Sequence, residues 1–177
     1  NISSGLGHSM LRIVGCRTIP GNKLDECSKD QEFDVVLNYS AQIRRSSISY
    51  IKGLIGKYHN VLSAMSYDQT VLTYVYNENR DLLSYELNLT TEEKIKLLQQ
   101  ACEDLWAYRG SYKFINSNCV TELRDLFQST FGSSMKRQSK TRTPKGLKKL
   151  LVSSNIISPT ATEIKYSMKT TIKKIIS

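Results

Sequence analysis

The sequence lacks several features that would each point to a large class of proteins. It has no run of about 18 apolar residues, so no segment is expected to span a membrane by itself. It has no CxxC motif, and its two histidines do not combine with its four cysteines at zinc-binding spacing, so neither a metal site nor a cofactor is expected. The chain begins at Asn1 without a basic and then apolar leader, which suggests a mature or excised fragment.

Acidic residues are nearly absent from the last quarter of the chain. The 177 residues carry a net charge of +9, yet residues 136–177 hold 11 Lys or Arg and a single acid, Glu163, whereas residues 1–135 are almost balanced. We therefore predict a body domain over 1–135 and a basic C-terminal arm over 136–177. The arm suits an anionic surface of phospholipid headgroups or nucleic acid, or is a solvated tail. The balanced body argues against nucleic acid as the main partner.

Two of the four cysteines flank a short polar loop with Pro and Gly. A disulfide between Cys16 and Cys27 would suit an exported protein, and two free thiols are an equal alternative. Cys102 has Leu98, Ala101 and Leu105 as neighbours at helical spacing, so we expect it to be a small buried apolar residue.

The apolar pattern predicts a mixture of strands and helices. The clearest helix begins at the capping box of Thr90 and Glu93, ends at Gly110 and has a stripe of Ile95, Leu98, Ala101, Cys102, Leu105 and Trp106. A second helix is predicted over 118–131, with weaker helices over 46–60, 147–155 and 158–177. Strands are predicted over 8–15, 33–43, 70–77 and 82–89. This order indicates an α+β fold.

Cys119 lies where the second helix is expected to begin. Asn118 or Asn116 can cap the helix, whose free backbone N–H groups and dipole favour an anion. A thiolate there would have a pKa below the usual value of about 8.5, and the same N–H groups could hold an oxyanion. A nucleophilic cysteine also needs a base, for which the sequence offers His8 and His59. The alternative is a structural cysteine at a helix start.

Five phrases extend this hypothesis. In order they are "GHSMLRI", "LNYSA", "YIKGLIGKYH", "RDLLSYELNLTTEEKIKLL" and "YKFINSNCVTELRDLF". Together they resemble the Lnb N-terminal periplasmic domain family over residues 5–131. The family's phenylalanine before Gly-His is Leu6 here, and the glycine after Asn-Tyr is Ser40, which is harder to reconcile with a close backbone approach.

The resemblance implies a permuted papain-like fold, with an antiparallel sheet packed on helices, as in NlpC-type peptidases and lecithin:retinol acyltransferase relatives. In that arrangement the histidine precedes the cysteine in the chain. Cys119 is then the nucleophile and His8 the general base, while Asn38 or, by preference, Tyr39 orients the imidazole.

Two further residues receive supporting roles, Asn118 from its place at the helix start and Arg124 from the same resemblance. Asn118 would support the oxyanion at the helix start. Arg124 would support the site or bind a headgroup, and its alternative is a surface ion pair with Glu122 or Asp125.

The resemblance also implies cysteine-dependent acyl transfer or hydrolysis through a thioester. The expected substrate is a phospholipid or a lipoprotein at the bacterial cell envelope, on the periplasmic side, with the basic arm on an anionic membrane surface. The alternatives are a cysteine peptidase or amidase on the same scaffold, and a non-enzymatic basic module that binds membrane or nucleic acid.

Overall fold

A four-stranded antiparallel sheet forms the centre of the molecule. The computed structural model describes residues 7–15, 31–43, 49–107, 110–132, 135 and 141–164. The sheet has the order β1-β2-β3-β5, and a second sheet pairs β4 with β6. Their bounds are Leu11–Ile13 (β1), Val35–Gln42 (β2), Tyr58–Ser66 (β3), Leu82–Ser84 (β4), Gly110–Tyr112 (β5) and Thr162–Ile164 (β6).

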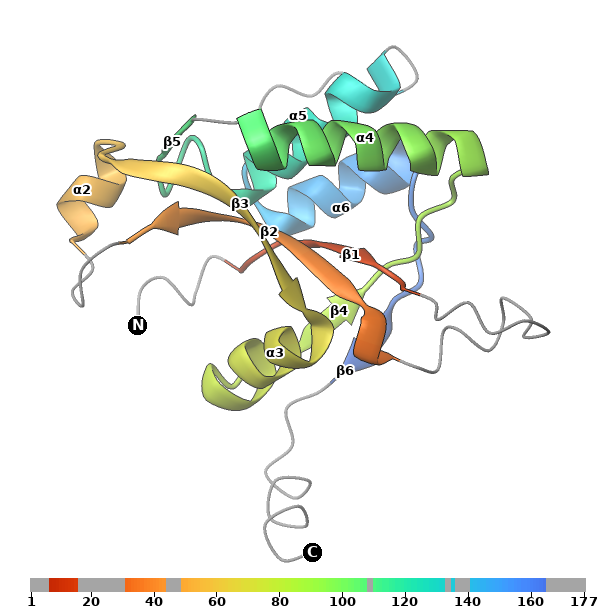
Figure 1. Cartoon of the computed structure of the whole chain (residues 1–177), viewed down its shortest axis with the longest axis horizontal. Helices are drawn as coiled ribbons and strands as arrows, with labels where there is room; N and C mark the ends of the chain where they lie inside the picture. Colours follow the sequence, from red (N-terminus) through yellow and green to blue (C-terminus); the bar gives the residue numbers. More distant parts are fainter. Residues whose placement is uncertain are drawn as a thin grey trace, which may run out of the picture.

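Helices cover both faces of the main sheet (Figure 1). Helices α4, α5 and α6 lie on one face, and α3 with η3 lies on the other. The helical segments are η2 (Gln31–Phe33), α2 (Tyr50–Leu54), α3 (Tyr67–Val71), the π-helix η3 (Leu72–Asn77), α4 (Thr91–Ala107), α5 (Cys119–Phe131) and α6 (Pro144–Ser153). The predicted α+β class is therefore confirmed, with an antiparallel sheet. No helix within the described ranges has the length and hydropathy needed to cross a membrane.

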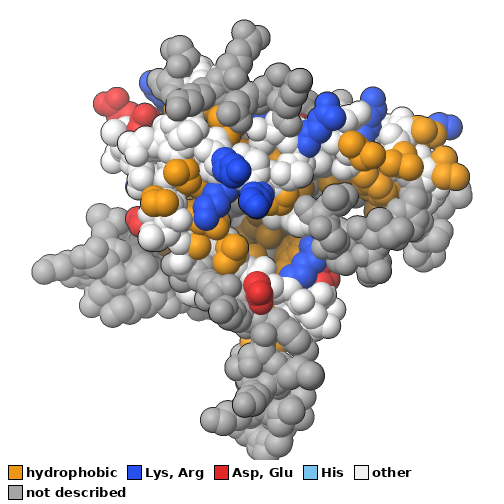
Figure 2. Space-filling view, turned by 180° about the vertical axis from the view of Figure 1, so that it is seen from behind, with side chains coloured by type: hydrophobic (Ala, Val, Ile, Leu, Met, Phe, Trp, Pro, Cys, Tyr) orange, Lys and Arg blue, Asp and Glu red, His pale blue; other side chains and the backbone are white. Residues whose placement is uncertain are grey.

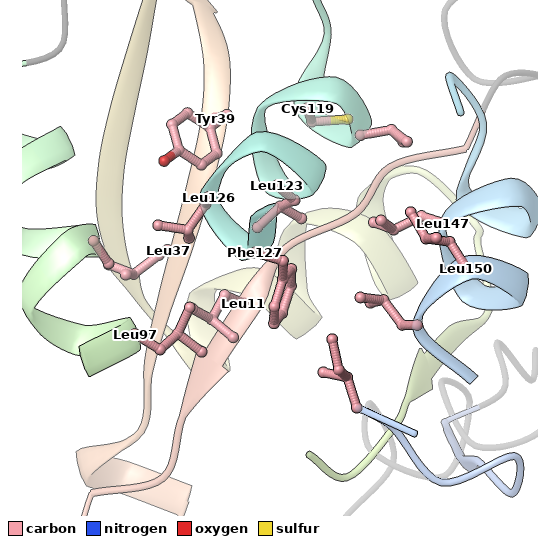
Figure 3. Packing of buried hydrophobic residues seen from close by; sticks show 14 of the residues in the cluster. Leu11, Leu37, Tyr39, Leu97, Cys119, Leu123, Leu126, Phe127, Leu147 and Leu150 are labelled. Carbon is pink, nitrogen blue, oxygen red and sulfur yellow. The ribbon is translucent and has the colours of Figure 1, made fainter. Parts of the chain in front are cut away.

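The main core lies between the sheet and the helices α4, α5 and α6. Leu11 and Leu37 from the sheet face Leu123, Leu126 and Phe127 from α5, as Figure 3 shows. Helix α6 adds Leu147, Leu150 and Leu151, and the segment after it adds Ile156 and Ile157. The core thus continues past residue 135, into the stretch that the sequence assigned to the basic arm.

An ion pair between Arg12 and the buried Asp34 ties β1 to the start of β2. Asp34 is 1% exposed and accepts hydrogen bonds from the Arg12 guanidinium, including one from Nε at 2.6 Å, and from the Gly15 backbone N–H at 3.0 Å. The same guanidinium lies 3.7 Å from the centre of the Tyr67 ring. These contacts anchor β1, a strand of only three residues, and so hold the segment that precedes it.

Several predicted elements differ from the structure. The predicted strand over 70–77 is wrong, because these residues belong to α3 and η3. Strand β3 was missed, since the helix expected over 46–60 is reduced to α2. The terminal helix expected over 158–177 is a strand at 162–164, and residues 165–177 lie outside the described part.

Helix α4 buries a narrower face than predicted. Leu97 and Ala101 are 3% and 1% exposed, but Ile95, Leu98, Cys102 and Trp106 are exposed. The expectation of a buried Cys102 is therefore wrong, because this side of the helix faces solvent. The predicted choice between a Cys16–Cys27 disulfide and free thiols falls outside the described residues.

Candidate functional site

Cys119 is the first residue of α5, as the sequence predicted for a helix start. Asn118 is the N-cap: its side-chain oxygen accepts hydrogen bonds from the backbone N–H groups of Val120 at 3.0 Å and Thr121 at 3.2 Å. The Thr121 hydroxyl in turn accepts from the Asn118 backbone N–H at 2.8 Å, which completes a capping box. This local arrangement fixes the first turn of the helix and therefore the position of the thiol.

The thiol is buried, and burial decides its pKa. Cys119 is 4% exposed, and loss of solvent raises the pKa of the thiol above its ordinary value. Hydrogen bonds to the sulfur lower the pKa, but by less than burial raises it. They come from the backbone N–H groups of Ser9, Val120 and Cys119 and from the Tyr112 hydroxyl. The expectation of a lowered pKa is therefore wrong. The helix N-terminus acts as predicted, but the loss of water around the sulfur outweighs it.

His8 lies just before β1 and is held by two neighbours. Its Nε2 is 2.5 Å from the side-chain oxygen of Asn38 on β2, and its ring stacks on that of Tyr74 with centroids 5.5 Å apart. Burial lowers the pKa of the imidazole, and the Asn38 hydrogen bond raises it in part. The charge of Arg80 lowers the same pKa further, and that of Glu78 raises it. The neutral ring is therefore favoured near neutral pH.

The Asn38 contact also fixes the tautomer of this neutral ring. An amide oxygen only accepts hydrogen bonds, so Nε2 of His8 carries the hydrogen. The lone pair of the neutral imidazole is then on Nδ1. Asn38 thus orients a base whose free nitrogen is Nδ1.

His8 and Cys119 share the same immediate surroundings. The backbone N–H of Ser9, the residue after His8, interacts with the Cys119 thiol. The Tyr74 ring stacks on His8, and the pKa of its hydroxyl, raised mainly by burial and then by Glu78, is raised further by the charge of Cys119. Within the described part of the chain, however, no direct hydrogen bond joins the His8 ring to the Cys119 sulfur. The five side chains of this cluster, the candidate site, are His8, Asn38, Tyr74, Tyr112 and Cys119.

The structure separates the two residues that were expected to orient the imidazole. Successive residues of β2 point to opposite faces of the sheet. Asn38 faces His8, whereas Tyr39 is 1% exposed and donates its hydroxyl hydrogen to Asp104 of α4. The preference for Tyr39 is therefore corrected in favour of Asn38, and Tyr39 belongs to the core.

Asn118 and Arg124 serve the scaffold in the described structure. The Asn118 amide nitrogen donates to the carbonyls of Phe114 at 3.2 Å and Arg142 at 3.3 Å. Arg124 pairs with Asp125 at 2.7 Å, which is one of the two ion pairs considered from the sequence, and donates to the Thr141 carbonyl at 3.3 Å. Both residues thus connect α5 to the segment before α6.

Tyr74 and Tyr112 were missed by the sequence analysis. Tyr112 opens the phrase "YKFINSNC", so its fixed distance from the cysteine was an available signal. Burial chiefly raises the pKa of its hydroxyl, and the nearby Cys119 raises it further. Tyr74 gave no such signal, because it lies in the stretch that was predicted to be a strand. The other histidine, His59, is exposed on β3.

Metal-ligating side chains do not gather in the described ranges. No group of three or more His, Cys, Asp or Glu residues there has the geometry to hold a metal ion. The residues of the candidate site offer a thiol, an imidazole, an amide and two phenols. Chemically, such a set can carry out nucleophilic attack by sulfur with proton transfer to nitrogen.

Comparison with known proteins connects this geometry to a family. No curated protein and no solved structure matches the chain. The family model described as the Lnb N-terminal periplasmic domain matches residues 1–154 and so includes the whole candidate site and α6. That description indicates a periplasmic domain, in agreement with the expected location facing the cell envelope. The match covers most of the chain, and the protein therefore belongs to the Lnb N-terminal periplasmic domain family.

Proposed function

We propose that this chain is a bacterial thiol enzyme that transfers or hydrolyses acyl groups through a thioester on Cys119. His8 is the general base, and Asn38 is the residue that orients it. The fold is of the permuted papain-like type, in which the histidine strand precedes the cysteine helix. The substrate is an acyl-bearing lipid or lipoprotein at the surface of a membrane.

One observation carries this proposal. A cysteine at the first turn of a helix lies beside the segment that bears an imidazole, and Nε2 of that imidazole is held by an amide oxygen. A structural cysteine has no need of an oriented base nearby. The shared neighbours Ser9 and Tyr74 support the assignment of both groups to one site.

The reaction begins when sulfur attacks the carbonyl carbon of an ester. Nδ1 of His8 takes the thiol proton as the C–S bond forms, and negative charge moves to the carbonyl oxygen. The backbone N–H groups of Cys119 and Ser9 are the donors proposed for this oxyanion. The C–O bond then breaks, and the His8 imidazolium returns its proton to the leaving alcohol. The product of this half-reaction is a thioester on Cys119.

The second half-reaction reverses these roles. An amine or a water molecule attacks the thioester carbonyl, and Nδ1 of His8 accepts its proton. The C–S bond breaks, and the sulfur regains the proton from His8. An amine acceptor gives an amide, as N-acylation of a lipoprotein requires, and water gives a free fatty acid.

The resting site is proposed to be a neutral thiol and a neutral imidazole. Burial raises the pKa of Cys119 and lowers that of His8, so both effects oppose a thiolate–imidazolium pair. Proton transfer then accompanies the attack, rather than preceding it.

The test is a search for the acyl-enzyme. Wild type, Cys119→Ala and the matched control Cys102→Ala are each incubated with phospholipids, a diacylated lipopeptide and acylated peptides, and the intact mass is measured. We expect an acyl adduct on wild type and on Cys102→Ala, and none on Cys119→Ala. Adducts only from peptide substrates would replace the lipid assignment with a peptidase or amidase. The absence of any adduct on Cys119 would overturn the enzyme proposal.

A further inference from the structure

Four isoleucine and leucine side chains protrude at one end of the molecule. Ile51, Leu54 and Ile55 of the α2 segment are 72%, 53% and 55% exposed, and Ile115 in the turn before α5 is 54% exposed. The three on α2 are spaced so that they share one helical face. We call these four residues the apolar tip. Single exposed apolar side chains are common, but a contiguous group of this size indicates a binding surface.

Backbone and side-chain contacts hold the two segments of the apolar tip together. The Phe114 backbone N–H donates to the Gly53 carbonyl at 3.1 Å, and the Phe114 ring packs directly on Gly53. A Cβ on Gly53 would lie 2.2 Å from a carbon of that ring. The Ser111 hydroxyl donates to the Gly56 carbonyl. Helix α2 and the turn before α5 therefore form one unit, although they are far apart in the sequence.

The charged side chains within the two segments that form the apolar tip have a single sign. Lys52, Lys57 and Lys113 are exposed beside it, and residues 49–60 and 110–118 contain no Asp or Glu. Figure 2 shows apolar side chains gathered at the end of the molecule where α2 lies, with basic side chains next to them. Apolar side chains bordered by lysines are typical of surfaces that enter the headgroup region of an anionic bilayer.

Another exposed apolar surface on the molecule has a different charge pattern. Ile95, Leu98 and Trp106 of α4 are 50%, 38% and 79% exposed. This helix, however, holds four acidic residues against two lysines. An anionic membrane would repel the α4 surface and attract the apolar tip, so the two surfaces form a matched pair for experiment.

We propose that the apolar tip inserts into the surface of an anionic phospholipid bilayer, with its three lysines at the level of the headgroups. This surface is distinct from the basic C-terminal arm. It adds a membrane-facing side to the proposed function. Only the biological role of this binding, and not the binding itself, rests on that function. The tip adjoins the candidate site, because the Phe114 ring contacts that of Tyr112 edge-on, with centroids 6.1 Å apart, and Tyr112 neighbours the Cys119 thiol. Insertion therefore brings the thiol close to the lipid ester groups.

The test is binding of the full chain to vesicles of phosphatidylcholine with and without phosphatidylglycerol, measured by sedimentation. The double variant Leu54→Ser, Ile55→Ser should bind the anionic vesicles more weakly than wild type by about tenfold or more, since two large apolar side chains no longer enter the interface. The matched control Ile95→Ser, Leu98→Ser should stay within about twofold of wild type. Because the basic arm is present in every variant, it does not contribute to these differences. Equal weakening in both variants, or none in either, would overturn the proposal.

A fluorescent reporter gives a second, independent reading. In the variant Trp106→Phe, Leu54→Trp, the new tryptophan should shift its emission to shorter wavelength when anionic vesicles are added. The native Trp106 of the wild type should not shift. An unshifted reporter at position 54 would contradict insertion even if sedimentation showed binding.

The same assays separate this proposal from the proposed function. Cys119→Ala should bind vesicles as wild type does while forming no acyl adduct. A tip variant with weak binding should still form an adduct with a water-soluble ester. Failure of membrane binding and failure of the chemistry would therefore appear in different measurements.

Discussion

At the level of single residues, burial favours the neutral form of both reactive groups. It raises the pKa of the Cys119 thiol and lowers that of the His8 imidazole, so each group is held in its neutral form. The hydrogen bonds around them act against burial but are weaker. The protonation state of the site is thus set by exclusion of water more than by the helix N-terminus.

Alkylation rates give a direct measure of the reactivity of the Cys119 thiol. Between pH 7 and 8 we expect iodoacetamide to modify the exposed Cys102 faster than the buried Cys119, because a raised pKa leaves less thiolate. The Cys119 rate should climb only above the usual thiol pKa of about 8.5, because the pKa of this thiol is raised. Peptide mass spectrometry after short pulses distinguishes the two cysteines. Faster modification of Cys119 at pH 7 would instead indicate a thiolate–imidazolium pair.

Asn38 is expected to act on the reaction through His8. Asn38→Ala should lower kcat/KM about tenfold or more, because the imidazole loses the partner that fixes its tautomer. The Asn38 hydrogen bond raises the pKa of His8, so its loss should move the acid limb of the kcat/KM profile to lower pH. A carboxylate in Asn38→Asp should move the limb to higher pH. A limb that stays in place in both variants would mean that Asn38 is only structural.

The choice between Asn38 and Tyr39 shows where sequence reasoning stopped at this scale. The phrase "LNYSA" located the correct strand, and the alternation of a strand separates the two residues onto opposite faces. Which face carries His8 depends on the packing of α3, η3 and α4, and the local sequence pattern does not predict that packing. The partner of Tyr39 on α4, Asp104, is 65 residues away in the chain.

At the level of elements, α5 positions the nucleophile, and the contribution of its N-cap Asn118 can be tested directly by substitution. Asn118→Ala should lower the free energy of unfolding by about 1 kcal/mol, because the backbone N–H groups of Val120 and Thr121 lose their acceptor. Asn118→Ser retains a capping oxygen and should recover part of this loss. Urea unfolding measures both variants, and equal stability of Asn118→Ala and wild type would contradict the assigned cap.

The helices with local start and stop signals could be predicted from the sequence. Helix α4 has the Thr90–Glu93 capping box, and α5 has Asn118 before it and Gly132 after it. The stretch 70–77 could not, because its alternating β-branched and aromatic residues favour a strand, whereas Ser66 caps a helix that begins directly where β3 ends. Strand β3 was hidden by small and polar residues, since only packing shows that Asn60 is buried.

At the level of the whole molecule, the body of the protein does not end where the charge changes. The basic residues begin at 136, but α6 buries Leu147, Leu150 and Leu151 in the main core, and the family match extends to residue 154. An amphipathic helix can carry many lysines on its outer side while its apolar face completes a core. Charge composition therefore indicated a surface property and not a folding boundary.

Truncation tests this extent of the fold. A chain that ends at residue 135 should show no cooperative urea transition. It lacks three leucines and two isoleucines of the core, and each of these side chains contributes about 1.5–3 kcal/mol to folding. A chain that ends at residue 164 should retain a cooperative urea transition. A cooperative transition in the shorter chain would mean that α6 is dispensable for folding.

The sequence separation of His8 and Cys119 has a consequence for the timing of the chemistry. The two groups come together only when β1 has paired with β2 and α5 has packed on the sheet. On the proposed mechanism, an extended chain in transit to the periplasm carries a thiol without a base and is inert toward the lipids it passes. Reactivity then begins with folding itself, and no inhibitory segment is required to delay it.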